Sequence, residues 1–292
     1  MSPVEVFGRQ LDRVAANGRS FVKMHGLGND FVIVDGREEA FEPTVEEVVH
    51  ICDRHRGVGA DQLLIIERPK RPEADAFLRI LNVDGREVGM CGNATRCIAW
   101  LLMTQTGRDR IALETFAGIF ECRSSGPMSV AVDLGRPRRN WRDIPLSEPR
   151  DTLHISFSQS PLKDGVAMSI GVPHIVFFVP NLRAVDIPSV GRAVQNDRLF
   201  AEQVNVGFAE ILGLNRIGLQ VWERPGILTL ACASGACVAV AAARARGLIL
   251  ADQVTVEMPG GVVNVTEGPD GRLTMAGQVE VSYIGIIPMR DL

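Results

Sequence analysis

The sequence predicts an α+β protein with two pseudo-symmetric domains, because the chain repeats one order of strands and helices at an offset of about 141–144 residues. Cys91 matches Cys232, and each cysteine opens a segment of small apolar residues that is typical of a buried helix. Three strand-like segments match in the same order: 29–34 with 172–177, 113–120 with 256–263, and 132–135 with 274–277. A repeat of this length indicates two homologous domains and not a solenoid.

Local patterns within the halves support the same class. Short apolar segments bounded by Gly, Pro and Asp predict strands at 31–34, 61–67, 78–83 and 111–122. A helix is predicted over 44–54, where Thr44 is a suitable N-cap and two glutamates follow in the first turn. Helices are also predicted after Cys91 and after Cys232, and the Ala-rich segment Cys237–Arg246 of the second ends at Gly247, a residue typical of helix C-termini. Its small side chains suit burial inside a curved sheet.

Composition excludes several function classes. The chain has 292 residues, 31 basic and 35 acidic, and a net charge of −4, so it offers no general polycationic surface for nucleic acid. The first twenty residues contain no apolar core of signal-peptide length. Elsewhere, no apolar stretch is long enough to span a bilayer. We therefore expect a cytoplasmic protein with neither nucleic acid nor membrane as a partner.

The cysteine and lysine content argues against bound cofactors. The six cysteines, at positions 52, 91, 97, 122, 232 and 237, have spacings that match neither a small disulfide scaffold nor a structural zinc site. Only three lysines are present, and none stands in a phosphate-cradling context, which argues against pyridoxal phosphate. We expect no metal and no cofactor.

Two of the cysteines precede predicted helix starts and are followed by small residues. The segments are Cys91-Gly92-Asn93-Ala94 and Cys232-Ala233-Ser234-Gly235. Free backbone N–H groups and the helix dipole at such a start bind a carboxylate, and the same field lowers the pKa of a nearby thiol. Two such half-sites facing each other would place a thiol on each side of a bound carboxylic acid. That arrangement suits removal of a proton from one face of a carbon and delivery to the other.

Eight motifs in this order resemble those of the diaminopimelate epimerase family, whose members are cofactor-independent, two-cysteine epimerases. The motifs are Lys23-Met24-His25-Gly26-Leu27-Gly28-Asn29-Asp30-Phe31, Gly57-Val58-Gly59-Ala60-Asp61-Gln62, Asn82-Val83-Asp84-Gly85, Met90-Cys91-Gly92-Asn93, Gly171-Val172-Pro173-His174, Val204-Asn205-Val206-Gly207-Phe208, Trp222-Glu223-Arg224 and Ala231-Cys232-Ala233-Ser234-Gly235-Ala236-Cys237. The resemblance runs from Phe21 to the C-terminus.

This resemblance implies a fold and a domain organisation. Each domain would be a mixed β-sheet wrapped around a central helix, with the active site in the cleft between the domains. We expect an N-terminal extension over 1–20, a first half over 21–139 completed by a C-terminal strand at 281–292, and a second half over 140–280. The resemblance also implies a homodimer.

The family's functional residues map onto particular positions of this chain. Cys91 and Cys232 match the two acid/base thiols. The backbone amides of Gly92, Asn93, Ala233 and Ser234 match the groups that hold the reacting α-carboxylate. The substrate's distal amino-acid end would be bound by Asn29, Gln62, Asn82, Asn205, Glu223 and Arg224. His174 matches a supporting histidine, although its residue type alone favours a structural role. Cys97 and Cys237 fall inside the helices and are expected to be buried small hydrophobes.

Four positions depart from the family pattern. Val172 stands where the pattern has Asn, while Ala94, Ala233 and Pro225 each replace Gly. An alanine at 233 would strain the chain only if that position required a positive φ. Val172 cannot hydrogen-bond, so a polar substrate group facing it would lose about 1–3 kcal/mol.

Three function classes are therefore compared. The preferred reading is epimerisation of LL- to meso-diaminopimelate in the biosynthesis of lysine and peptidoglycan precursors, and the alternative is racemisation of a different amino acid by the same chemistry. A thiol-redox protein would require a Cys-x-x-Cys motif or a resolving thiol within reach, and neither is evident. A catalytically inactive binding protein of this fold would be expected to have lost one of the two cysteines, and this chain keeps both.

Overall fold

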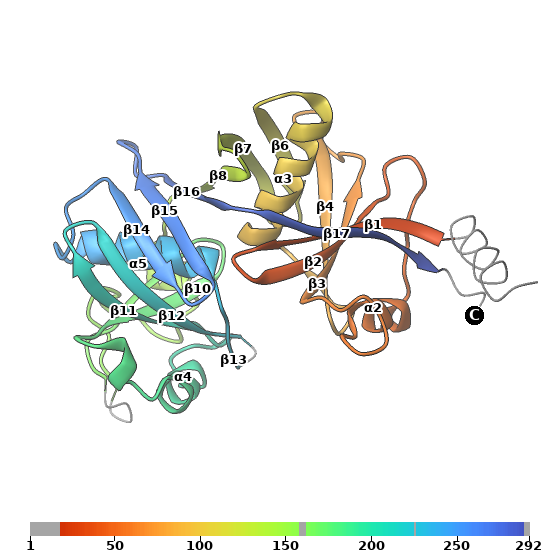
Figure 1. Ribbon diagram of the computed structural model, residues 1–292. Coiled ribbons are helices and arrows are strands. Elements are labelled where there is room, and N and C mark those ends of the chain that lie inside the picture. The colour runs from red at the N-terminus through yellow and green to blue at the C-terminus, as the bar shows by residue number, and fades with distance from the viewer. Residues whose placement is uncertain (1–17, 158–161, 225, 289–292) are drawn as a thin grey trace, which may run out of the picture. The chain divides into compact units, whose positions relative to one another are not determined.

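The computed structural model describes residues 18–157, 162–224 and 226–288, which form two compact units (Figure 1). One unit takes the described residues up to Cys122 and those from Val279 onward, and the other takes those from Arg123 to Gln278. Both are dominated by strands, which confirms the predicted α+β class. No helix among the described residues is long and apolar enough to cross a membrane.

The first unit is a mixed sheet with two helices. Its strands are β1 Gly18–Gly26, β2 Asn29–Asp35, β3 Gln62–Glu67, β4 Ala76–Asn82, β5 Glu87–Val88, β6 Arg110–Thr115 and β17 Glu280–Pro288, and its helices are α2 Val45–Cys52 and α3 Gly92–Thr106. The strand order is β17-β1-β2-β3-β4-β6, with β5 also paired to β4. The β2–β3 and β4–β6 pairs are parallel, and the others are antiparallel.

The second unit repeats this order. Its strands are β8 Ser129–Gly135, β9 Val166–Ser169, β10 Pro173–Phe178, β11 Asn205–Gly213, β12 Arg216–Glu223, β13 Ile227–Leu228, β14 Gln253–Met258, β15 Gly261–Glu267 and β16 Leu273–Gln278. Its helices are α4 Ile187–Gln195 and α5 Ala233–Ala245, and two 3₁₀ turns lie at Trp141–Asp143 and Leu182–Ala184. The order β9-β10-β11-β12-β14 matches β1-β2-β3-β4-β6 in strand direction at every pairing. The duplication in the sequence is therefore a duplication of topology.

Each sheet carries a helix that is mostly buried. In α5, Ala233 and every residue from Gly235 to Ala243 are buried, and the helix contacts strands β9, β10, β11, β12, β14, β15 and β16. Figure 1 shows α5 among the strands of its own unit. A helix that is apolar on all sides is stable only when it is surrounded, and Ala and Gly side chains allow strands to approach it closely. Most of α3 is buried in the same way.

The shorter helices pack against separate clusters of apolar side chains. Helix α2 contributes Val48 and Ile51 to a cluster with Val32, Val34 and Leu63 on β2 and β3. Helix α4 contributes to a cluster that includes side chains of β10, β11 and β12. Strands β2, β3 and β10 are buried at successive positions and therefore on both faces, so they appear in the sequence as continuous apolar segments. Helix α2 has the predicted cap, because the Thr44 hydroxyl accepts from the Glu47 N–H in a capping box.

Three boundaries differ from those expected. Residues 18–20 belong to β1, and residues 1–17 lie outside the described residues. The segment 111–122 is not one strand, because a turn after Thr115 divides it between β6 and β7 Gly118–Gly126. The units divide after Cys122, earlier than residue 139, because β8 pairs with β16 of the second unit. In return, β17 pairs with β1 of the first unit.

Candidate active site

Cys91 stands at the N-terminus of α3. It is the N-cap residue, with extended backbone angles of φ −140° and ψ 114°, and its side chain makes no capping hydrogen bond. The first N–H groups of a helix have no partner within the helix, so those of Gly92 and Asn93 are suited to bind an anion. Gly92 and Asn93 are both buried. The predicted helix start after the first thiol is therefore confirmed.

Cys232 occupies the same position in α5. Its backbone angles, φ −126° and ψ 107°, are close to those of Cys91, and its side chain likewise makes no capping hydrogen bond. Ala233 is the first helical residue and is not among the described non-glycine residues with positive φ. The alanine that follows this thiol therefore causes no backbone strain, and its N–H remains suited to anion binding.

In the first unit, the polar residues gather at one edge of the sheet. Asn29 and Gln62 begin the parallel strands β2 and β3, and Asn82 ends the antiparallel strand β4, so all three lie at the same edge. Gln62 Nε2 donates to Asn82 Oδ1 at 2.9 Å, while the buried Oε1 of Gln62 has no hydrogen-bond partner among the described residues. That oxygen is suited to accept a hydrogen bond from a bound ligand.

Asn29 connects this edge to the first thiol. Its Oδ1 accepts from Asn93 Nδ2 at 3.1 Å and from Cys91 Sγ at 3.6 Å. Its Nδ2 donates to Asp61 Oδ2 at 2.9 Å. The carboxamide is thus held at both ends, and Asp61 is a member of the site that the sequence reasoning did not assign. Asp61 stands in the motif Gly57–Gln62, but nothing in that motif indicates that Asp61 pairs with Asn29.

An ion-pair cluster anchors the β1–β2 hairpin that carries Asn29. Lys23 Nζ lies 2.6 Å from Asp30 Oδ2 and also donates to the Gly59 carbonyl. Arg54 donates to both Asp30 oxygens, at 2.9 and 2.7 Å. Burial opposes the charge of Asp30, but hydrogen bonds from Arg54 and Lys23 outweigh it and hold the pKa of that carboxyl well below its usual range.

The second unit also gathers three predicted site residues at one edge of its sheet, and two of them, Asn205 and Glu223, match Gln62 and Asn82 in register. His174 and Asn205 lie near the starts of parallel strands β10 and β11, and Glu223 ends β12, so they also share one edge of the sheet. Asn205 Oδ1 accepts from the Arg224 N–H at 2.9 Å, so its Nδ2 faces His174 Nε2 at 3.4 Å. The Ser234 hydroxyl lies 2.9 Å from the same Nε2.

His174 is neutral in this environment. It is fully buried, and burial together with the charge of Arg224 lowers its pKa to about 3. Because Nε2 accepts from Asn205, the neutral ring carries its proton on Nδ1, which has no partner among the described residues. His174 therefore supports Ser234 and Asn205 by hydrogen bonding and carries no charge at neutral pH.

Cys232 has Glu223, Ser234 and Gly235 as polar neighbours. Its Sγ lies 3.6 Å from Ser234 Oγ. Burial and the nearby Glu223 carboxylate raise the pKa of the thiol well above its usual value, while hydrogen bonds from Ser234 and the Gly235 N–H act in the opposite direction. Burial also raises the pKa of Glu223, whose carboxylate accepts from the Thr229 hydroxyl. Glu223 thus touches the thiol, a contact that the sequence reasoning did not assign.

Arg224 and Val172 mark the remaining candidate positions in this unit. Arg224 Nη1 donates to the Glu202 carbonyl at 3.0 Å, and no described carboxylate pairs with the guanidinium. Val172 is half-buried in the turn before β10. Pro225, which replaces a Gly of the family pattern, lies outside the described residues.

None of the other four cysteines stands at the N-terminus of a helix. Cys52, Cys97, Cys122 and Cys237 are all buried, and none of the four forms a disulfide. Burial raises the pKa of Cys52 to about 11 and that of Cys97 to about 12, so both are protonated at neutral pH. Across the described ranges, no group of three or more His, Cys, Asp or Glu side chains is arranged to hold a metal ion.

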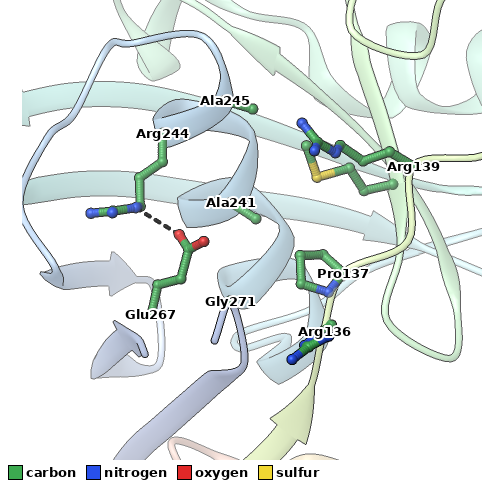
Figure 2. A pocket seen from close by; sticks show the side chains of 9 residues that line it. Arg136, Pro137, Arg139, Ala241, Arg244, Ala245, Glu267 and Gly271 are labelled. Atoms are coloured by element: carbon green, nitrogen blue, oxygen red, sulfur yellow. Dashed lines mark ion pairs between the residues drawn. The ribbon is translucent and has the colours of Figure 1, made fainter. Parts of the chain in front are cut away.

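A hollow of about 400 Å³ lies further along α5, away from Cys232 (Figure 2). Ala241 and Ala245, near the C-terminal end of the helix, form part of its wall, and Arg139 faces them. The Arg244–Glu267 ion pair, at 2.6 Å, borders the same hollow. None of the predicted site residues lines it, so it is separate from the thiol site.

Solved structures with this fold include several isomerases. A hydroxyproline epimerase from Agrobacterium vitis matches with a TM-score of 0.67 at 17% identity, over 93% of this chain and 91% of that one. A predicted epimerase from Pseudomonas aeruginosa matches with a TM-score of 0.66 at 16% identity, over 93% and 100%. At these identities the likeness shows the fold alone.

Sequence comparison identifies the family. The diaminopimelate epimerase family model matches residues 21–140 and 166–282. A diaminopimelate epimerase from Acidiphilium cryptum is 46% identical over 92% of this chain and 96% of its own length. One from Phenylobacterium zucineum is 45% identical, over 94% and 99%. The chain is an isomerase and belongs to the diaminopimelate epimerase family.

The neutral state of His174 gives a testable pH dependence. The unfolded chain binds a proton at His174 below about pH 6.5, whereas the folded chain does so only near pH 3, so this residue makes stability fall as pH decreases between those values. In NMR titrations we expect the His174 ring signals to stay constant from pH 8 to pH 5. The His174→Gln variant assigns those signals and should show a shallower loss of stability with acid. A His174 signal that titrates near pH 6.5 would contradict this prediction.

Proposed function

We propose that this protein inverts the configuration of an amino acid at its α-carbon, and that its substrate is LL-diaminopimelate, which it converts to the meso form. The observation that carries the proposal is the matched geometry of Cys91 and Cys232, each at the N-cap of a buried helix with the same extended backbone conformation. Relatives up to 46% identical that are named diaminopimelate epimerase support the choice of substrate.

The α-carboxylate would be held by helix N-termini. In this proposal the backbone N–H groups of Gly92 and Asn93 from α3, and of Ala233 and Ser234 from α5, donate to the carboxylate oxygens. The positive ends of both helix dipoles then face the negative charge that develops when the α-proton leaves. The α-proton of an amino acid is very weakly acidic, so this stabilisation is the main contribution required from the protein.

The proton transfer itself uses the two thiols as a pair. One cysteine, as thiolate, takes the α-proton, and the electron pair of the broken C–H bond is delocalised into the bound carboxylate. The other cysteine, as thiol, delivers its proton to the opposite face of the same carbon. The product has inverted configuration, and the two cysteines have exchanged protonation states. The reaction needs neither metal nor cofactor in this scheme.

The polar surroundings of Cys232 fit a thiol that changes protonation state. Ser234 and the Gly235 N–H are donors that stabilise a thiolate, while Glu223 opposes it. The substrate's α-ammonium brings a positive charge to the site on binding. That charge offsets the effect of the Glu223 carboxylate, so we propose that the reactive thiolate forms with the substrate bound.

The second amino-acid end of diaminopimelate has matching groups in the chain. Arg224 has no described carboxylate partner, and its guanidinium presents a fork for the distal carboxylate. The buried Oε1 of Gln62 is an acceptor for the distal ammonium, with Asn82 beside it. Asn205 positions Arg224 through its backbone N–H. We therefore favour a substrate with a charged amino-acid group at each end.

We also propose that the protein is a cytoplasmic homodimer. Apolar side chains on β17 remain exposed in the single chain, among them Tyr283, Ile284 and Ile286. An exposed apolar strip on a strand of this kind fits contact with a second copy. Light scattering of the purified protein should give the mass of two chains.

Each thiol should be required for α-proton exchange. We expect Cys91→Ala and Cys232→Ala each to lower the rate of deuterium incorporation at the α-carbon in D₂O by about 10²–10⁴-fold, because each removes an acid/base group. The matched controls are Cys97→Ala and Cys237→Ala, which change a buried cysteine in the same two helices and should retain near wild-type rates. Near wild-type exchange by Cys91→Ala or Cys232→Ala would rule out the two-thiol scheme.

Val172 decides between diaminopimelate and another amino acid. With LL- or meso-diaminopimelate as substrate, Val172→Asn should leave turnover similar or raise it, because the amide adds a partner for the polar distal end. Arg224→Leu should raise KM for diaminopimelate about 10–100-fold, because a charged hydrogen-bond pair is lost. The measurement is deuterium incorporation across a panel of amino acids. Exchange of a different amino acid, with none of diaminopimelate, would favour the alternative racemase.

A further inference from the structure

Arg96 is a fully buried cation in the second turn of α3. Its exposed fraction is 0%, the same as that of the apolar residues around it, and its Nη2 donates to Asn93 Oδ1 at 2.9 Å. Burying a charged side chain is costly unless it is held by specific polar contacts. Asn93, which accepts this hydrogen bond, lies two positions after Cys91. A buried positive charge is therefore held next to the first turn of α3, beside the Cys91 cluster.

The other half of the molecule shows that the helix does not need an arginine at this position. When Cys91 is matched with Cys232, Asn93 matches Ser234 and Arg96 matches Cys237. Cys237 is also fully buried, and α5 packs within its sheet with a small neutral side chain there. Packing of a central helix in this fold therefore does not explain Arg96.

Arg96 also contacts the hairpin that carries Asn29. A Cβ atom added to Gly26, the last residue of β1, would lie 3.0 Å from Arg96 Nη2 and 3.3 Å from Asn93 Cβ. The guanidinium therefore lies against the backbone of Gly26, three residues before Asn29. The absence of a side chain at Gly26 provides the space for this approach.

These contacts fix the orientation of two carboxamides. Because Arg96 donates to Asn93 Oδ1, the Nδ2 of Asn93 points the other way and donates to Asn29 Oδ1 at 3.1 Å. Asp61 accepts from the Nδ2 of Asn29 and so fixes the same orientation from the other end. The result is that Asn29 presents its carbonyl oxygen to Cys91 Sγ, at 3.6 Å.

We propose that Arg96 is a positioning residue, which acts through Asn93 and Asn29 to hold the Cys91 S–H by its hydrogen bond to Asn29 Oδ1. A carbonyl oxygen accepts from a thiol and repels a thiolate, so this orientation keeps Cys91 as the proton donor until the substrate arrives. The reverse orientation of Asn29 would present an NH₂ group and favour the thiolate. The inference rests on the proposed function of Cys91.

The first test is a kinetic comparison of variants at Arg96. Arg96→Met should lower kcat for α-proton exchange by about 10–100-fold and leave KM within about 3-fold, because the acid is misplaced while the carboxylate site remains. Arg96→Lys, which keeps a donor and a charge, should recover most of the loss. The control is Cys97→Ala, a change at the next buried residue of α3, with kcat near wild type. Equal losses in Arg96→Met and Arg96→Lys would overturn the proposal.

A double-mutant cycle tests whether Arg96 acts through Asn93. If it does, Arg96→Met should change kcat by less than about 2-fold in a protein that already carries Asn93→Ala. In that protein the hydrogen bonds that link Arg96 to Asn29 through Asn93 are already lost. Additive effects of the two substitutions would overturn the proposal. Should Arg96→Met not fold, Gly26→Ala replaces it, because the added methyl displaces the guanidinium without removing its charge; a wild-type kcat in Gly26→Ala then counts against the proposal.

A spectroscopic measurement separates this inference from the proposed function. The Asn93 side-chain amide protons should exchange slowly with solvent in the wild-type protein and in Arg96→Lys, and rapidly in Arg96→Met. Slow exchange in Arg96→Met would overturn the positioning role whether or not the enzyme is active. If the wild-type protein incorporates deuterium into no amino acid of the panel, the proposed function is overturned instead. The contacts of Arg96 with Asn93 and Asn29 would then have no catalytic role.

Discussion

The burial of α3 and α5 is the constraint on which the rest of this structure depends. A helix surrounded by its own sheet cannot tilt or fray freely, so its first turn occupies a defined position relative to the strand ends. Cys91 and Cys232 are placed by those first turns, and their similar backbone angles follow from the repeated topology. Polar residues are brought to one edge of the first sheet by β2, β3 and β4. They are brought to the corresponding edge of the second sheet by β10, β11 and β12. The repeated topology thus produces two similar clusters of polar residues, each beside a cysteine at a helix N-terminus.

The two half-sites differ in how they hold the residue that lies two positions after the thiol. In the first, the buried cation Arg96 holds the Asn93 carboxamide; in the second, the neutral His174 holds the Ser234 hydroxyl. The thiol environments differ accordingly. Cys91 faces a carbonyl oxygen of Asn29, whereas Cys232 lies among Ser234, Gly235 and Glu223. The duplicated scaffold therefore carries two chemically distinct thiol environments.

The sequence predicted the fold class, the duplication and both helix starts, because these depend on local patterns: small residues after a cysteine, a capping threonine, apolar segments between turns. It did not predict the division of the units, because the pairing of β8 with β16 joins segments more than a hundred residues apart. Nor did it predict Asp61 or Arg96 as members of the first cluster, or the contact of Glu223 with Cys232. Those assignments depend on side-chain orientation across strands, which no spacing in the chain records.

The exchange of β8 and β17 between the two sequence halves has a consequence for how the chain is made. The second unit is continuous from Arg123 to Gln278, so one uninterrupted stretch of chain supplies all of its strands. The first unit is discontinuous: β1, at its beginning, pairs with β17, which follows every strand of the second unit in the chain. Domains that form during synthesis do so in the order in which their segments become available. The first unit therefore cannot complete its sheet until β17 has been made, after every strand of the second unit.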